Sequence, residues 1–525
     1  MAETNILLGV GGTGAKVVEA ALVLLAAGLG PRVVHVGLVD QDSTNGNVTR
    51  TRKLLSDYGE FRRLWSDGER NKIDWASEAG PAFGKTAILP LFEKPQPSPL
   101  WCPSLTKGSL KAILGENLTE DQRHLFNLLF MEGKEEQDLP LEQGYRGRAH
   151  VGSAALVASL LAEDCTLIAR LKELMENAGQ QAVNIFIVGS AFGGTGASGF
   201  PTFARHLNNL RKTLQNREQI AIAGLLMLPY FEFRNPEDEE TVSVVTSNEL
   251  LPKAQLALEY YENLFKHEEV FDRFFVAGWR PTLFKLDYHA AGSDKQTNPA
   301  LLPELMAATS VCEFFARSEL EKNEGGEAGS KVPVMTAARE GESIKWRDLP
   351  PGPPVRKRVG QLLRFAVYWR YHAKALLTEK SWVPGRRTWA QKLAGDVGIE
   401  ESEDQLNALD RLLDDILAWA ATIEKMGERY WVNGPWSLEA LKAPGHVETP
   451  TEPIALGNSF PEQHLLDAFD RLVRIDTGDP EPRQGAAVHD HLVRADPSPG
   501  EHRGIGRAIA AAFDAVTVDP SFQRS

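Results

Sequence analysis

The chain has 525 residues, 42% hydrophobic and 24% charged, as in ordinary folded proteins of roughly three or four domains. Its net charge of −14 argues against a broad basic surface for nucleic acid. The three cysteines, Cys102, Cys165 and Cys312, are too far apart for a disulfide framework or a paired-cysteine metal site, and they favour a reducing compartment. The longest apolar stretch, residues 17–29, is too short to span a bilayer, and no signal-peptide pattern precedes it, so we expect a cytoplasmic protein.

The N-terminal part of the chain predicts alternating strands and helices. Residues 4–9 and 33–39 are continuous apolar strands, and residues 16–27 between them have apolar side chains at helical spacing. The same alternation returns later as helix, strand, helix and strand, at residues 151–174, 183–188, 200–214 and 220–228. Such alternation is typical of a parallel sheet buried on both faces, so we expect an α/β fold with a mostly parallel, Rossmann-like sheet flanked by helices.

The other parts of the chain predict mainly helices. Residues 51–140 are less regular and indicate a helical insertion. Residues 250–266 predict a long central helix, and residues 303–316 predict another. Beyond residue 350 the periodic segments are all helical, at residues 356–378, 403–426, 462–474 and 503–513. We therefore expect a mainly helical C-terminal domain.

A glycine turn follows the first strand. Residues 9–14, with the sequence GVGGTG, open a helix, where free backbone N–H groups and the helix dipole favour a phosphate. Asp40 ends the next strand, where a carboxylate that binds a ribose is expected. This turn predicts a nucleotide site.

A second glycine turn, SAFGGTGASG at residues 190–199, also follows a buried strand and opens a helix. Because the carboxyl ends of parallel strands meet at one edge of a sheet, the two turns are expected to hold one polyphosphate from two sides. This pairing is the most specific feature of the sequence.

The second turn resembles the signature loop of the tubulin/FtsZ superfamily, and other segments occur in that family's order. Residues 9–14 and 40–42 are similar to its first two loops, Gly147 and Gly152 to its third phosphate loop, and residues 228–233 to the loop after the next strand. The resemblance covers roughly residues 4–316 and is closest to the bacterial tubulin-like domain proteins.

The resemblance implies binding of GTP or GDP with Mg²⁺, and head-to-tail assembly into filaments with the nucleotide between subunits. The implied nucleotide-binding residues are Gly11, Gly12, Thr13, Gly14, Asp40, Gln41, Ala191, Phe192, Gly193, Gly194, Thr195, Gly196, Pro229 and Asn248, of which Asn248 stands where the family reads the guanine edge. Residues 1–50 and 141–250 then form the nucleotide-binding domain, with 51–140 inserted. Residues 251–350 hold the central helix and the catalytic loop of a second domain, and residues 351–525 are a helical domain that offers a surface to a partner protein.

The family's catalytic loop, Asn-x-Asp-x-x-Asp/Glu, is only partly matched. Asn298 fits, but Ala300 and Pro303 stand at the two acidic positions, and the first carboxylate is Glu304. The resemblance implies that Asn298 and Glu304 position the attacking water, whereas Glu304 is alternatively an acid in the first turn of a helix. We therefore expect weak or absent GTP hydrolysis. Lys16 either adds a charge toward phosphate or is solvated.

Three other functions remain open. The first turn and Asp40 are compatible with a Rossmann-type enzyme that uses NAD(P) or FAD. The first turn together with residues 40–42, Asn47 and Arg50 is similar to a ThiF-like adenylating enzyme, with a spacing that differs by one residue. The degenerate catalytic loop also suits a non-polymerising, nucleotide-dependent scaffold. For such a scaffold, the resemblance to bacterial tubulin-like domain proteins implies, by analogy alone, a multi-component bacterial system directed against phage.

Overall fold

The structure, a computed structural model, describes most of the chain in segments. These are residues 3–66, 72–75, 80–93, 95–103, 108–116, 118–133, 136–145, 147–233, 247–286, 297–324, 334–336, 346, 349, 353–378, 387–395, 402–429, 435–438, 472–473, 485–494 and 503–516. Among these residues, no helix combines the length and the apolarity needed to cross a membrane.

An eight-stranded sheet organises the N-terminal two thirds of the chain. Its strands are β1 (Thr4–Val10), β2 (Val33–Val39), β3 (Ala87–Pro90), β4 (Leu100–Trp101), β5 (Val183–Ser190), β6 (Ile220–Met227), β8 (Arg273–Ala277) and β10 (Val334–Thr336). Their order is β10-β8-β6-β5-β1-β2-β3, β4 also pairs with β2, and every one of these pairs is parallel. The short strands β7 (Glu232–Phe233) and β9 (Lys285–Leu286) form a separate two-stranded sheet.

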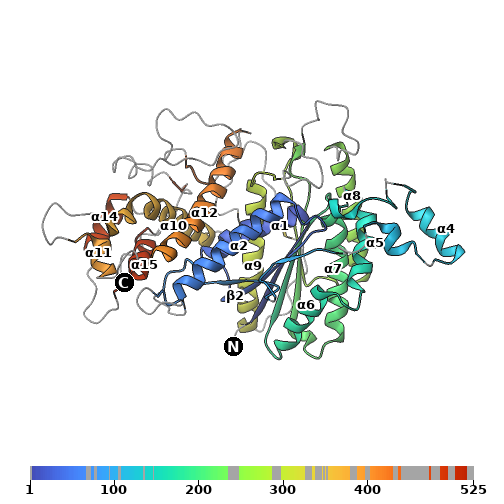
Figure 1. Ribbon diagram of the computed structural model, residues 1–525, viewed down its shortest axis with the longest axis horizontal. Coiled ribbons are helices and arrows are strands. Elements are labelled where there is room, and N and C mark those ends of the chain that lie inside the picture. The colour runs from blue at the N-terminus through green and yellow to red at the C-terminus, as the bar shows by residue number, and fades with distance from the viewer. Residues whose placement is uncertain are drawn as a thin grey trace.

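Helices cover both faces of the sheet, because alternate strand residues face opposite sides and nearly all of them are apolar. On β1, Leu7 packs into one core, whereas Ile6 and Leu8 pack into the other. The first face carries α1 (Gly11–Ala26), α2 (Gly46–Ser66) and α9 (Leu302–Glu324), and the second carries α5 (Ala149–Leu160), α6 (Thr166–Asn177), α7 (Gly194–Thr213) and α8 (Ser247–His267) (Figure 1). The predicted α/β fold with helices on both sides of a parallel sheet is confirmed.

The central helix is not the one expected at residues 250–266. The helix there, α8, lies at the surface, where Leu251 is 59% and Leu256 is 66% exposed. The buried helix is α9, which packs against α1, β5, β6 and β8. Polar residues on one side of α8 suit a helix with a solvent face, whereas residues 302–315 are almost all apolar or small, and all but one of them are buried. The sequence predicted that the central helix precedes the loop at residues 298–304. In the structure this loop instead leads directly into the central helix, α9.

The region expected to be a helical insertion also takes part in the sheet. The boundary at residue 50 falls inside α2, which packs on α1, and β3 and β4 extend the sheet beyond β2. Strands of four and two residues are too short to show a period in the sequence. The helices α3 (Leu110–Leu114) and α4 (Glu120–Leu129) then follow. Likewise, β8 and β10 join the same sheet, whereas β9 pairs with β7 in the separate two-stranded sheet.

The helical C-terminal region is confirmed. Its helices are α10 (Pro353–Tyr368), which continues into a π-helical turn (Trp369–Ala373), α11 (Trp389–Ala394), α12 (Glu403–Arg429), α14 (Gly485–Arg494) and α15 (Ile505–Ala515). α12 packs along α2, where Trp65 donates its indole N–H to Gln405 O (3.1 Å) and Arg411 pairs with Glu60 (2.7 Å). Most of the helix expected at residues 462–474 lies outside the described residues.

Candidate functional site

The two glycine turns lie side by side at the carboxyl edge of the sheet. β1 and β5 pair in parallel, from Thr4 opposite Val183 to Gly9 opposite Val188. The chain leaves β1 into α1 on one face and leaves β5 into α7 on the other face. This is the point at which the strand order reverses, and open α/β sheets bind their ligands in the crevice at such a point.

The turns touch through backbone atoms that only glycine permits. Gly11 has φ +75°, and a Cβ there would lie 2.8 Å from Gly196 N. At Gly196 a Cβ would lie 3.4 Å from Val10 O of the first turn, and at Gly14 it would lie 2.8 Å from Val188 O at the end of β5. The glycines are therefore required for the first turn to pack against the second.

Helix N-termini converge on this edge. α1, α7 and α5 each begin here, and in the described part of the chain none of the three has a side-chain cap or an acidic residue in its first turn. Their first N–H groups and the positive ends of their dipoles are therefore left for a ligand. Gly12 and Thr13 of the first turn and Gly193 and Gly194 of the second are partly exposed. Together these features make a site for an anion such as a phosphate.

Asp40 connects the second turn to the end of β2. It is 3% exposed, and Thr195 donates its hydroxyl to Asp40 Oδ1 at 3.1 Å. The backbone N–H of Asp42 donates to the same oxygen at 3.2 Å. Burial raises the pKa of Asp40 to about 7, and the nearby Asp42 carboxylate adds to the shift, against these hydrogen bonds. Because burial disfavours the ionised form of Asp40, a cation next to the carboxylate would stabilise that charged form.

The third predicted loop joins the other two. Gly147 has φ +76°, and a Cβ on Gly194 would lie 3.0 Å from Gly147 N. Tyr145, which is buried, donates its hydroxyl to Gln41 Oε1 at 3.3 Å. The structure thus brings residues of three predicted loops together around one edge of the sheet.

Asparagines close the site on the side of α2. A Cβ on Gly12 would lie 3.0 Å from Asn45 Nδ2, and Asn47 accepts the N–H of Asn298 at 2.9 Å. Arg50 donates to Asn298 O at 2.8 Å and binds both carboxylate oxygens of Glu19. Asn298 is therefore held beside the first turn of its own chain. Asn45 was not expected, although an Asn-Gly pair just before a helix start is a recognisable signal.

Glu304 and Lys16 form an ion pair inside the protein. Both are almost fully buried, and Tyr230 donates its hydroxyl to Glu304 Oε1 at 2.6 Å. Glu304 Oε2 accepts the N–H of Leu301 at 2.9 Å, as an acid in the first turn of α9 does. Burial lowers the pKa of Lys16, and the Glu304 carboxylate opposes that shift. Lys16 is thus not solvated, because its ammonium group is buried against the Glu304 carboxylate.

The remaining predicted residues occupy the margins of the site. Ala191 and Phe192 are buried in the second turn, and Pro229, also buried, follows β6. Tyr230, next to Pro229, is a site neighbour that the sequence did not single out. Asn248 falls in the first turn of α8, but its side chain lies outside what the structure describes.

Comparison with known proteins gives a family match for the part of the chain that contains the second glycine turn. Residues 146–250 match the protein-family model described as tubulin like. The matched stretch includes α5, β5, the second glycine turn, α7 and β6. Neither the comparison with curated proteins nor the comparison with solved structures gave a match.

Proposed function

We propose, from the tubulin-like domain over residues 146–250, that this chain binds GTP or GDP at the carboxyl edge of its sheet. The observation that carries the proposal is the contact of the two glycine turns between the N-termini of α1 and α7. In this arrangement the backbone N–H groups of residues 11–14 and 193–196 would hold the phosphates. The hydroxyls of Thr13 and Thr195 would add to them.

Mg²⁺ is the cation that a nucleotide at this edge is expected to bring. When bound, it would supply positive charge shared with the phosphate oxygens. Asp40 and Asp42 fit that requirement, because both carboxylates lie at the end of β2 and Asp40 hydrogen-bonds Thr195 of the second turn. A nearby dication would lower the pKa of Asp40 from about 7.

Base recognition and assembly are the finer parts of the proposal. The guanine preference rests on the family, with Asn248 and Pro229 as the proposed contacts and Gln41 and Tyr145 beside the phosphates. Gly12, Thr13, Gly193 and Gly194 are partly exposed at this edge, where a second copy stacked on it would cover the nucleotide. We therefore expect head-to-tail filaments, and the C-terminal helices are proposed to bind a partner protein.

The catalytic role of Asn298 and Glu304 stays a prediction, and their contacts favour the alternative. A carboxylate that acts on the nucleotide of a neighbouring copy must reach the surface, whereas Glu304 is 1% exposed and bound to Lys16 and Tyr230. On this basis turnover is slow, and Glu304→Gln leaves phosphate release per folded molecule unchanged. A large loss of release in a variant that still binds GTP would assign Glu304 to catalysis.

The binding proposal is tested by titrating the nucleotide-free protein with GTP. In Gly194→Val the new side chain starts 3.0 Å from Gly147 N and 3.1 Å from Tyr145 Cβ, so binding should be lost. Gly59→Ala is the matched control, because a Cβ at Gly59 meets no atom within 4 Å. Full GTP affinity in folded Gly194→Val would contradict the proposal.

A further inference from the structure

Two asparagine side chains lie against the first glycine turn on the side of α2. A Cβ on Gly12 would lie 3.0 Å from Asn45 Nδ2 and 3.4 Å from Asn47 Nδ2, so both amide groups are close to the backbone of the turn. Asn45 is 6% and Asn47 2% exposed, whereas Gly12 itself is partly exposed. The two amides therefore border the place that a ligand of this turn would occupy.

The orientation of each amide is fixed by the hydrogen bond that its oxygen accepts. Asn45 Oδ1 accepts the N–H of Asn47 at 3.0 Å, as the residue before a helix commonly does, and Asn47 Oδ1 accepts the N–H of Asn298 at 2.9 Å. A backbone N–H only donates, so the side-chain atom that faces it must be the amide oxygen. The other amide atom, Nδ2, is therefore identified as a donor in both side chains.

These NH₂ groups find little to bind in the part of the chain that the structure describes. Asn45 Nδ2 lies 3.5 Å from Asp40 Oδ2, which is long for a hydrogen bond. Among the described residues, the hydrogen bonds of Asn47 use its N–H, its C=O and its Oδ1, and none uses Nδ2. A buried donor without an acceptor is unfavourable, so it indicates an acceptor that comes from a ligand.

Two basic side chains near the first turn in sequence are already bound to carboxylates. Lys16 of α1 pairs with Glu304, and Arg50 of α2 binds both carboxylate oxygens of Glu19. Neither is left as the cation that a phosphate site commonly uses. The neutral amides of Asn45 and Asn47 are donors that this side of the turn still offers.

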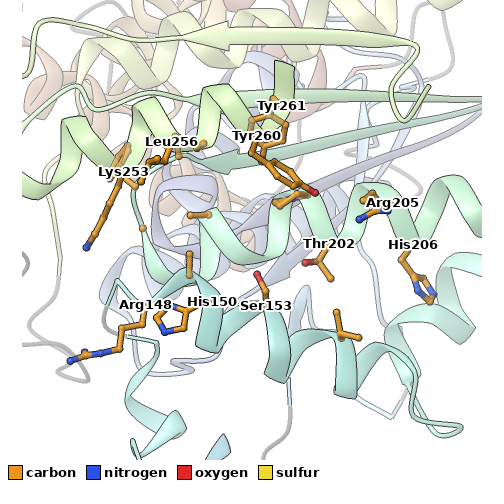
Figure 2. A pocket seen from close by; sticks show the side chains of 18 of the residues that line it. Arg148, His150, Ser153, Thr202, Arg205, His206, Lys253, Leu256, Tyr260 and Tyr261 are labelled. Carbon is orange, nitrogen blue, oxygen red and sulfur yellow. The ribbon is translucent and has the colours of Figure 1, made fainter. Parts of the chain in front are cut away.

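A cavity of about 770 Å³ borders the second turn at residues 191–193 and continues between α5, α7 and α8, as Figure 2 shows. Two of the basic residues that line it are paired as well, Arg205 with Glu268 and His150 with Glu136. Its walls are mainly apolar, which does not suit a phosphate. The asparagines beside the first turn are therefore the better side-chain donors for phosphate oxygens.

We infer that Asn45 and Asn47 are phosphate-binding residues, whose Nδ2 groups donate to phosphate oxygens of a nucleotide at the first turn. Asparagine amides bind phosphate oxygens in this way without a charge of their own. Here they add to the backbone N–H groups of residues 11–14. The inference rests on the proposed function, because it assigns two further contacts within the same site.

Substitutions that keep the accepting oxygen and remove the NH₂ group separate binding from structure. In Asn45→Ser the hydroxyl still accepts the N–H of Asn47, and in Asn47→Asp a carboxylate oxygen still accepts the N–H of Asn298. Titration of the nucleotide-free protein with GTP should show an affinity about tenfold or more below that of the wild type for each variant, because each loses a hydrogen bond to a charged group. The loss in Asn47→Asp should be larger in EDTA, since Mg²⁺ otherwise offsets the repulsion between the new carboxylate and the phosphates.

Asn263→Ser and Asn263→Asp are the matched controls, because Asn263 is exposed on α8, and both should bind GTP as the wild type does. Guanosine, which has no phosphate, should bind Asn45→Ser and Asn47→Asp as it binds the wild type. Urea midpoints establish that each variant is folded.

Wild-type GTP affinity in folded Asn45→Ser and Asn47→Asp would overturn the inference and leave the asparagines a structural role. An equal loss of affinity for guanosine would also overturn it, because the amides would then contact the ribose or the base. Both results keep the proposed function, since the wild type still binds GTP. A wild type that binds no GTP would contradict the proposed function itself, and the inference with it.

Discussion

Replacing Gly11 with alanine should destabilise the protein for two reasons, an unfavourable backbone conformation and a steric clash of the new Cβ. The residue has φ +75°, a conformation that costs an L-residue about 1–2 kcal/mol. The new Cβ would also lie 2.8 Å from Gly196 N, and this backbone atom cannot rotate away as the end of a side chain can. Overpacking of this kind costs about 1–3 kcal/mol. The sum is about 2–5 kcal/mol, and the shift of the first turn should abolish nucleotide binding.

The control variant, Gly59→Ala, should change the free energy of unfolding in the opposite direction. Gly59 lies inside α2 with open space around the position of a Cβ, so Gly59→Ala should stabilise the protein by about 0.5–1 kcal/mol. Urea unfolding followed by tryptophan fluorescence measures both changes, and GTP titration measures binding. If the urea midpoint of Gly11→Ala equalled that of the wild type, the contact between the two turns would be refuted.

Two further predictions concern buried charges. The unfolded chain releases the Asp40 proton near pH 3.8 and the folded chain holds it to about 7, so stability falls as pH rises between these values. Asp40→Asn should flatten that fall in urea midpoints measured from pH 4 to 8, and an unchanged slope would place the titration elsewhere. Lys16→Met should cost about 3–5 kcal/mol, because it leaves the Glu304 carboxylate buried without its cation. The double variant Lys16→Met/Glu304→Gln should cost less than the two single changes added together, and strict additivity in this cycle would argue against the pair.

Local features of the site were predictable from the sequence, whereas long-range pairings were not. The glycine turns, Asp40 and the strands before them were recognisable because each depends on neighbouring residues: apolar runs, glycines and a strand-ending acid. The pairing of Lys16 with Glu304 joins residues 288 positions apart in sequence, and no local pattern predicts it.

The choice of central helix shows the same limit. Residues 250–266 and 302–324 are both long helices, and length alone does not decide which of them is buried. The informative signal was the composition of residues 302–315, which leaves almost no polar side for solvent. β3 and β4 were missed because strands of four and two residues depend on the neighbouring β2 for their hydrogen bonds.

The most direct test of the GTP site is to identify the nucleotide that the protein carries. The purified protein is denatured, the released small molecules are separated by chromatography, and the procedure is repeated after incubation with GTP, ATP and NAD. We expect guanine nucleotide from the wild type and none from Gly11→Ala. Release of NAD, or of AMP formed from ATP, would contradict the account and assign the first glycine turn to a Rossmann-type or adenylating enzyme.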